Sequence, residues 1–367
     1  MKKTDKYKQH LISIRASAKH RKEVKRVVKK HNKLLGELKY FNDVRLNAIA
    51  KNKSYRKASH SKNQNINSQS FKRPVLKFVD KVAPSSFTLQ YEHCVPVIEF
   101  INELKELGKN GEHINIVMDD VIEIGEGAIS MLLSVINELG NNAILVRGTK
   151  PKNASANATL EKSGFFKYIT TILSAENLNT KNNILRTGDN KTPSSELAAE
   201  VRKSMETVWG VHSRCPRLFG GVIEMVRNSC DHAFKTEEGI TWHFGLSHFE
   251  EAKLVKFSFV DNGKGIIKTF ISGLLKRFVN LFQDNTDILT TAFRDGIESR
   301  TGLSWRGKGL PTIFELSSDK IVSRLVVITN DVYIDFDRNI KVTLPVSYSG
   351  TYYYWEVDSN CVKSYFT

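Results

Sequence analysis

The sequence predicts an α/β protein with a basic N-terminal segment, and three observations support this expectation. Short apolar segments alternate with amphipathic segments over residues 74–173, which is typical of strands and helices arranged in layers. Residues 196–367 combine a helix that has a polar face with a strand that runs into a glycine turn. Basic residues are concentrated in residues 1–73. We therefore expect a basic helical and flexible arm at 1–73, followed by α/β domains at 74–173 and 196–367 that are joined by a polar linker at 174–195.

Charge is distributed unevenly along the chain. The 367 residues carry a net charge of +16, yet residues 1–73 alone hold 22 Lys and Arg against 4 Asp and Glu, so the remaining residues sum to −2. Apolar residues recur at helical spacing between Arg15 and Phe41, whereas residues 51–73 are polar and basic. This pattern predicts a basic helix followed by a flexible arm. Residues 2–73 are suited to DNA or RNA, because Lys and Arg neutralise phosphate charge; an acidic protein surface and the membrane interface remain alternatives.

The composition also bears on the compartment. No apolar run approaches the ~20 residues that a membrane span needs, and the first residues lack the apolar core of a secretory signal. The four cysteines form no Cys-x-x-Cys pair and no metal-ligand spacing: they are Cys94, Cys215, Cys230 and Cys361. Free thiols are typical of a reducing compartment, so we expect a cytoplasmic protein without a membrane partner.

The alternation over residues 74–173 can be followed element by element. Strands are predicted from runs of apolar and β-branched residues, and helices from apolar residues at positions i, i+3 and i+4. The predicted strands span 75–79, 86–89, 114–119 and 143–147, and the predicted helices span 95–107, 127–139 and 157–163. This order predicts a layered domain in which helices cover a sheet.

The same region resembles a known family. A strand ends at Asp119, a loop and a helix follow, and after one more strand a helix ends in Ser163-Gly164-Phe165. This order resembles the STAS domains of anti-anti-sigma factors, in which a serine beside an aspartate at a helix start is a phosphorylated switch. Here Gly125-Glu126-Gly127 occupy that place without a serine, and the nearest serine, Ser130, falls inside the predicted helix. We therefore expect an interaction or scaffold module, through which a protein partner could bind.

Residues 218–234 are predicted to form a helix with one polar face. Glu224, Asn228 and Asp231 stand at positions i, i+4 and i+7, which share one side of a helix because each residue advances about 100°. An amide oxygen can hold a metal ion while a carboxylate accepts a proton from water. A solvated helix face is the alternative, since exposed charge is the normal state.

Three further motifs follow this helix. A strand over 255–261 ends in Asp261-Asn-Gly263-Lys-Gly265, a second glycine pair lies in Arg306-Gly307-Lys308-Gly309, and Gly350-Thr351 opens a strand over 352–357. Glu-x-x-x-Asn, Asp-x-Gly-x-Gly, Gly-x-Gly and Gly-Thr in this order resemble the nucleotide site of the GHKL superfamily. That superfamily includes the ATPases of gyrase and MutL, the histidine kinases and the anti-sigma-factor kinases. The resemblance covers Glu196 to Thr367 and implies a GHKL α/β sandwich.

The resemblance also implies roles for particular residues, with ATP and Mg²⁺ as cofactors. Glu224 becomes the catalytic base, Asn228 the protein ligand of Mg²⁺, and Asp261 the acceptor of a hydrogen bond from the adenine amine. One amide ligand suffices, because Mg²⁺ keeps several waters and phosphate oxygens. The segment 278–304 would be a lid over the nucleotide, with a short helix at 288–297. The further residues expected to bind the nucleotide are Asp231, Gly263, Gly265, Arg306, Gly307, Lys308, Gly309 and Thr351.

The function expected from these motifs is a Mg²⁺-dependent ATP-binding protein. We expect a slow ATPase whose nucleotide state switches interactions with nucleic acid or partner proteins, and which forms a homodimer. One alternative is an anti-sigma-type protein Ser/Thr kinase that acts in partner switching. Another is a non-catalytic, ATP-gated subunit of a bacterial stress or phage-defence complex. A histidine autokinase is disfavoured, because His212 lies only 12 residues before Glu224 and leaves no room for the usual helical hairpin.

Overall fold

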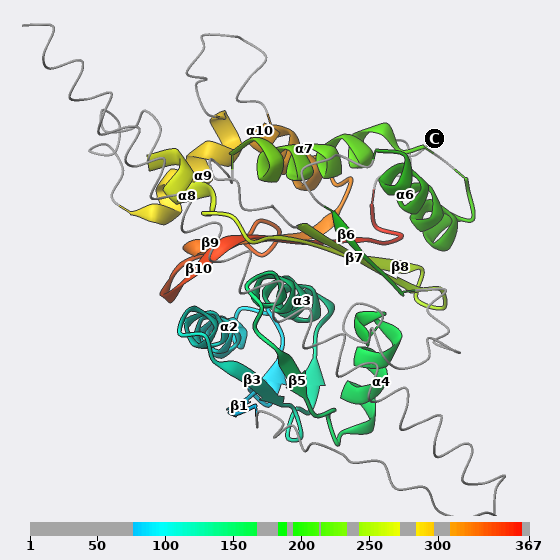
Figure 1. Ribbon diagram of the computed structural model, residues 1–367. Coiled ribbons are helices and arrows are strands. Elements are labelled where there is room, and N and C mark those ends of the chain that lie inside the picture. Colours follow the sequence, from blue (N-terminus) through cyan, green and yellow to red (C-terminus); the bar gives the residue numbers. More distant parts are fainter. Residues whose placement is uncertain are drawn as a thin grey trace, which may run out of the picture. The chain divides into compact units, whose positions relative to one another are not determined.

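The computed structural model describes most of the chain from residue 76 onward (Figure 1). Backbone contacts divide the chain into two units, 1–76 and 77–367, and every element described below belongs to the second. The basic arm predicted for residues 1–73 lies outside the described residues. Among the helices of the described ranges, none is both long enough and apolar enough to cross a membrane. The described ranges are 76–166, 183–188, 194–212, 214–232, 242–271, 284–296 and 309–361.

Residues 77–166 form a parallel sheet with helices, as the alternation of apolar segments predicts. The sheet has the strand order β1-β3-β5, and both neighbouring pairs are parallel. Its strands are β1 (Phe78–Val82), β3 (His113–Val117) and β5 (Val146–Gly148), and a separate parallel pair consists of β2 (Ser86–Phe87) and β4 (Glu123–Ile124). The helices are α2 (Cys94–Lys109), α3 (Glu126–Asn141) and α4 (Ala154–Lys162). The predicted helices of this region are confirmed, and Ser130 does lie inside α3.

The rest of the chain is built on a five-stranded antiparallel sheet. The strand order is β6-β7-β8-β10-β9, so the last strand in the sequence lies between two earlier ones. The strands are β6 (Asn183–Gly188), β7 (Trp242–Phe249), β8 (Leu254–Asp261), β9 (Ser323–Asp335) and β10 (Ile340–Val357). The mixed α/β class predicted from the sequence is therefore confirmed. Within the polar stretch 174–195, which is predicted to be a linker, the structure describes β6, an edge strand that pairs with β7.

Helices lie on both faces of this sheet (Figure 1). The first face packs against α6 (Ser194–Trp209), α7 (Pro216–His232), α9 (Asn285–Asp295) and α10 (Gly309–Ser318), with the short α8 (Ile266–Ile271) beside β9. We call it the α7 face. The opposite face packs against α2 and α3, and we call it the α3 face.

The α7 face is an aromatic core. The rings of Phe257 and Trp355 stack with centroids 5.1 Å apart and 10° between their planes, and Trp242 stacks on Phe259 at 5.9 Å. These side chains come from three neighbouring strands and are all almost fully buried. Such stacking adds about 0.5–1.5 kcal/mol per pair to the burial of the rings.

The α3 face combines tyrosine and aliphatic side chains with small and polar residues where α3 meets the strands. Gly127 allows α3 to approach β10 closely, because a Cβ there would lie 2.1 Å from the hydroxyl oxygen of Tyr352. The Ser130 hydroxyl lies 3.0 Å from that of Ser258 on β8. One continuous apolar core contains residues of α2 and α3 together with residues of β8, β9 and β10. Residues 77–166 are thus packed on the sheet, whereas the sequence suggested two domains held by a linker.

Candidate functional site

Asp261 lies at the end of β8 and joins three separate parts of the chain. Its side chain is buried, with 4% of its surface exposed. Oδ1 accepts hydrogen bonds from the backbone N–H groups of Gly263 (2.8 Å) and Thr351 (3.2 Å), and Oδ2 accepts one from the hydroxyl of Ser229 on α7 (2.9 Å). A carboxylate offers about four acceptor positions, so one position remains for a further donor.

The ionisation of Asp261 reflects opposing influences. Burial raises the pKa of Asp261, because the charged form loses its hydration. The hydrogen bonds from Gly263, Ser229 and Thr351 lower it, as does the positive charge of Lys105 on α2. The net pKa stays above the ordinary value, so the charge of this carboxylate is energetically costly unless a ligand donates to it.

The glycine turn after Asp261 is held close to β9. Gly265 has φ +84°, a conformation that glycine adopts without strain. A Cβ at this position would lie 2.5 Å from the Asn330 Oδ1 atom, so only glycine fits against that amide. Gly263, whose N–H donates to Asp261, lies in the same turn and is buried.

Two residues of β9 clamp this turn. Asn330 donates to the carbonyl of Lys264 (2.9 Å) and accepts from the N–H of Lys268 (3.2 Å). Thr329 accepts from the N–H of Ile266 (2.9 Å) and donates to the carbonyl of Gly350 (3.1 Å). The motif order did not reveal these residues. A signal existed, because the polar pair Thr329-Asn330 interrupts the apolar strand Leu325–Ile334.

Glu224, Asn228 and Gly309 meet at the junction of two helices. α7 carries the first two residues, and α10 begins at Gly309. A Cβ at Gly309 would lie 2.8 Å from Glu224 Oε2 and 3.3 Å from Asn228 Oδ1. The absence of a side chain therefore lets the start of α10 approach the polar side of α7. Free N–H groups at a helix start attract anions, so this junction is suited to a phosphate.

The polar groups at this junction are only partly paired. Glu224 Oε1 forms an ion pair with Arg227 one turn along α7, at 2.9 Å. The Asn228 Nδ2 atom is buried and finds no hydrogen-bond partner among the described residues. A buried amide N–H without an acceptor is costly, and a bound ligand with oxygen atoms would remove that cost.

The remaining predicted site residues are placed in part. Thr351 lies on β10, where its N–H donates a hydrogen bond to the Asp261 carboxylate. Its hydroxyl oxygen lies 3.4 Å from the hydroxyl oxygen of Thr329. Asp231 belongs to the last turn of α7, and its side chain lies outside the described residues. Arg306, Gly307 and Lys308 also lie outside them.

The predicted lid includes a packed helix. Within 278–304 the structure describes 284–296, where α9 begins after Asp284, whose carboxylate accepts from the N–H of Asp287 at 2.9 Å. Leu289, Ala292 and Phe293 are buried against the α7 face. This part of the segment is thus anchored to the sheet, and the short helix predicted at 288–297 is confirmed with earlier bounds.

The described residues contain no cluster of three or more His, Cys, Asp or Glu that could hold a metal ion by itself. A magnesium ion held by one amide oxygen and by phosphate oxygens needs no such cluster. No protein-family model matches this chain, and a search of curated proteins found no significant match.

Proposed function

We propose that the chain is a Mg²⁺-dependent ATP-binding protein that hydrolyses ATP slowly, and whose nucleotide state switches its interactions with nucleic acid or partner proteins. One observation carries this proposal: separate sequence motifs meet in space. Ser229 joins α7 to Asp261, Asp261 joins Gly263 to Thr351, and Gly309 adjoins Glu224 and Asn228. The proposal includes membership of the GHKL superfamily for residues 196–367 and a STAS-like character for residues 74–173.

Adenine is the base that fits Asp261 best. The carboxylate has acceptor positions only, so it pairs with the amine of adenine and not with the carbonyl at the same place on guanine. Among the described residues, the hydroxyl of Ser229 donates to its Oδ2, which can accept a second hydrogen bond. Gly265 lets the turn that follows Asp261 lie against Asn330 on β9, because a Cβ there would meet the Asn330 amide.

Asn228 and the start of α10 fit the triphosphate and its metal ion. Asn228 Oδ1 would bind Mg²⁺, which supplies charge to stabilise the phosphates, and the unpaired Nδ2 would donate to a phosphate oxygen. The N–H groups at the start of α10 would meet the phosphate chain, and in the sequence Arg306 and Lys308 directly precede them.

Glu224 would accept a proton from the attacking water. Its Oε2 faces Gly309, whereas its Oε1 is paired with Arg227. The ion pair holds the carboxylate in a fixed orientation, but it also stabilises the charge that must be neutralised when the proton arrives. This competition favours slow hydrolysis.

The burial of Ser130 bears on the partner-switching alternative. The Ser130 side chain is 1% exposed, and its hydroxyl meets both the carbonyl of Glu126 (3.1 Å) and the hydroxyl of Ser258. A kinase cannot reach this serine without opening the α3 face. The observation favours a STAS-like region that is a fixed layer of one ATP-binding unit, and phosphotransfer to another protein stays as the competing activity.

The test is nucleotide binding and turnover by purified protein, with and without DNA or RNA. Asp261→Asn should lose ATP affinity, whereas Glu224→Ala should bind ATP without hydrolysing it. Asp80→Asn and Glu250→Ala, at exposed positions, are the matched controls and should behave as wild type. Labelled ATP incubated with a cell extract separates hydrolysis from transfer to a protein. Absence of ATP binding by the wild-type protein at any Mg²⁺ concentration would refute the proposal.

In this proposal, residues 2–73 bind nucleic acid and residues 74–173 bind the protein partner. Stimulation of turnover by DNA or RNA should weaken steeply as salt rises, because phosphate contacts release counterions. Stimulation by DNA or RNA that does not depend on salt would count against phosphate contacts by these residues. A homodimer and a cytoplasmic location complete the proposal, and sedimentation with and without ATP tests the dimer.

A further inference from the structure

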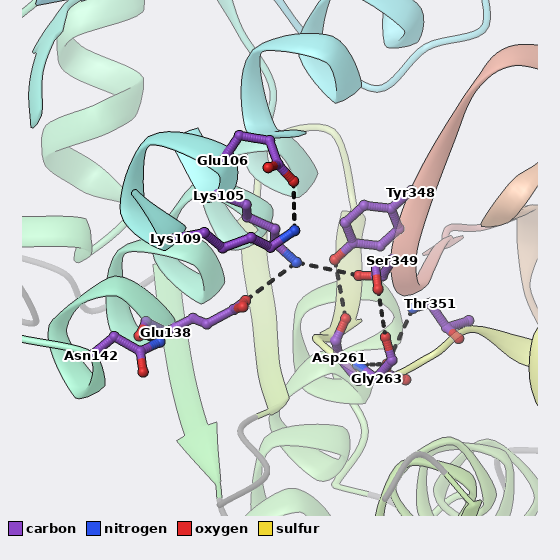
Figure 2. A network of polar contacts seen from close by, with 10 residues as sticks. All are labelled: Lys105, Glu106, Lys109, Glu138, Asn142, Asp261, Gly263, Tyr348, Ser349 and Thr351. Atoms are coloured by element: carbon purple, nitrogen blue, oxygen red, sulfur yellow. Dashed lines mark hydrogen bonds and ion pairs between the residues drawn. The ribbon is translucent and has the colours of Figure 1, made fainter. Parts of the chain in front are cut away.

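A chain of contacts runs from α2 to the backbone of the proposed adenine-binding turn (Figure 2). The Lys105 Nζ atom on α2 forms an ion pair with Glu138 of α3 at 3.2 Å and donates to the Ser349 carbonyl at 3.4 Å. It also lies 5.7 Å from the centre of the Tyr348 ring. Lys105 therefore links its own helix, α2, to α3 and to β10.

The second half of this chain reaches the turn itself. The Tyr348 hydroxyl donates to the backbone carbonyl of Asp261 at 3.0 Å, and the Ser349 hydroxyl donates to the carbonyl of Gly263 at 3.2 Å. Figure 2 shows both bonds beside the contact between Thr351 and the Asp261 carboxylate. These two carbonyls belong to the first and last residues of the segment Asp261–Gly263, which carries the carboxylate and begins the glycine turn.

The two side chains that form this chain of contacts are largely shielded from solvent. The Tyr348 side chain is 1% exposed, and the Lys105 side chain is 12% exposed. A second bond next to the link joins α2 and β10, since Asn102 donates to the Ser347 carbonyl at 3.0 Å. The bond from Tyr348 to the Asp261 carbonyl is buried, so the low dielectric strengthens it, and removing its donor leaves an acceptor unpaired. Lys105 also opposes the effect of burial on the pKa of Asp261, so its charge is felt at the carboxylate.

We infer that Lys105 and Tyr348 are positioning residues: they hold the Asp261–Gly263 turn in its ligand-binding conformation and thereby couple the α2–α3 layer to nucleotide affinity. The inference rests on the proposed ATP site and deepens it by naming what regulates it. Coupling of this kind is reciprocal, so ATP must stabilise α2 by the same free energy by which α2 strengthens ATP binding.

The test uses the full-length chain and three variants. Tyr348→Phe removes only the hydroxyl that donates to Asp261. Lys105→Met removes the charge and keeps the apolar stem, and Lys105→Arg restores a cation. Lys109→Met is the matched control, because Lys109 lies on the same helix, is 69% exposed and pairs only with Glu106 among the described residues.

The first readout needs no nucleotide. In ligand-free protein, Tyr348→Phe and Lys105→Met should accelerate hydrogen exchange of the Gly263 and Thr351 amides by about threefold to tenfold, the range expected for one lost hydrogen bond. Lys105→Arg and Lys109→Met should exchange as wild type does. Unchanged exchange in both Tyr348→Phe and Lys105→Met would overturn the inference, whatever the outcome with ATP.

The second readout separates positioning from general destabilisation. KM and Kd for ATP should rise by about threefold to tenfold in the same two variants, while kcat at saturation stays unchanged, because Glu224 is untouched. ATP should slow exchange in α2 of the wild type and do so less in Lys105→Met. If the wild type binds ATP and all variants bind it equally, the coupling is wrong and the proposed function stands. If the wild type binds no ATP, both fail together.

Discussion

The two faces of the five-stranded sheet pack against their helices in different ways, although the same strands form both. On the α7 face, stacked aromatic rings fill the space between the sheet and its helices, among them α7, which carries Glu224 and Asn228. On the α3 face, a glycine and two hydroxyl groups let a helix lie close to the strands. The first face is a rigid, volume-filling support, whereas the second is a close contact that depends on small residues. The α7 face therefore supports the helix that carries candidate site residues, whereas the α3 face connects the sheet to α2 and α3.

The largest expected effect tests the chemistry that the α7 face supports. Glu224→Gln keeps the shape of the side chain but cannot accept a proton, so kcat should fall by about 100-fold to 10,000-fold with ATP affinity nearly unchanged. Arg227→Gln releases Glu224 from its ion pair and should raise kcat a few-fold. Phosphate release under single-turnover conditions measures both. Equal activity of Glu224→Gln and wild type would remove Glu224 from the mechanism.

The next effect compares the two faces directly. Trp355→Ala leaves a large hole in the aromatic stack and should lower the free energy of unfolding by about 3–5 kcal/mol. Ser258→Ala on the opposite face should cost only about 1 kcal/mol, because Ser130 keeps its bond to the Glu126 carbonyl. Urea denaturation followed by fluorescence and circular dichroism gives both values. Similar costs for the two variants would contradict the division of roles between the faces.

Much of this fold can be predicted from the sequence because the apolar pattern is local. The bounds of α2, α3 and α7 lie within two residues of those expected, since their apolar positions recur at helical spacing. β1 begins three residues later than expected: Leu76 belongs to the apolar run of the sequence, but pairing with β3 starts at Phe78. The α/β class follows from these elements.

The packing of the layers was not predictable in this way. Nothing in the sequence near Gly127 or Ser130 shows that they face β8 and β10, which lie more than a hundred residues away. For Thr329 and Asn330 the sequence shows only that polar residues interrupt an apolar strand, and not that they clamp the turn after Asp261. Motif spacing predicted the candidate site residues, and the structure shows which distant residues pack against them.

A smaller effect concerns the carboxylate between the two faces. Because the folded pKa of Asp261 is raised, the folded protein binds a proton that the unfolded chain has lost, and stability falls as pH rises above about 3.8 toward the folded pKa. Asp261→Asn removes this cost, and its amide can donate to Ser229. We expect the variant to be as stable as wild type or more so at pH 7, with no such advantage at pH 3.5. Its ATP affinity should be about tenfold to 100-fold lower. Thermal melts across pH and calorimetric titration with ATP test the two statements.

The smallest effect uses two histidines that point to opposite sides of β7. Burial lowers the pKa of His243, toward the α3 face, to about 3, and lowers that of His248, toward α6, to about 4. Both are therefore neutral in the folded protein, and the unfolded chain takes up protons below about pH 6.5. Each should remove up to about 1.4 kcal/mol of stability per pH unit between pH 6.5 and 4.

His243→Gln should flatten this acid dependence by about half. His93→Gln, at an exposed position before α2, is the control and should leave the dependence unchanged. Urea midpoints measured from pH 7 to pH 4.5 provide the comparison. An unaltered slope in His243→Gln would show that the histidine is reached by water in the folded protein.

The position of β10 in the sheet has a consequence for synthesis. β10 lies between β8 and β9, although it follows both in the sequence. A nascent chain that has reached residue 339 holds β8 and β9 without the strand that separates them, and Asp261 has neither Thr351 nor Tyr348 as a partner. The ribosome must add β10 before these contacts can form, so a partly made chain lacks the complete candidate site. Assembly of the site is thus tied to one of the last pairing events of folding, a non-local step that is intrinsically slow.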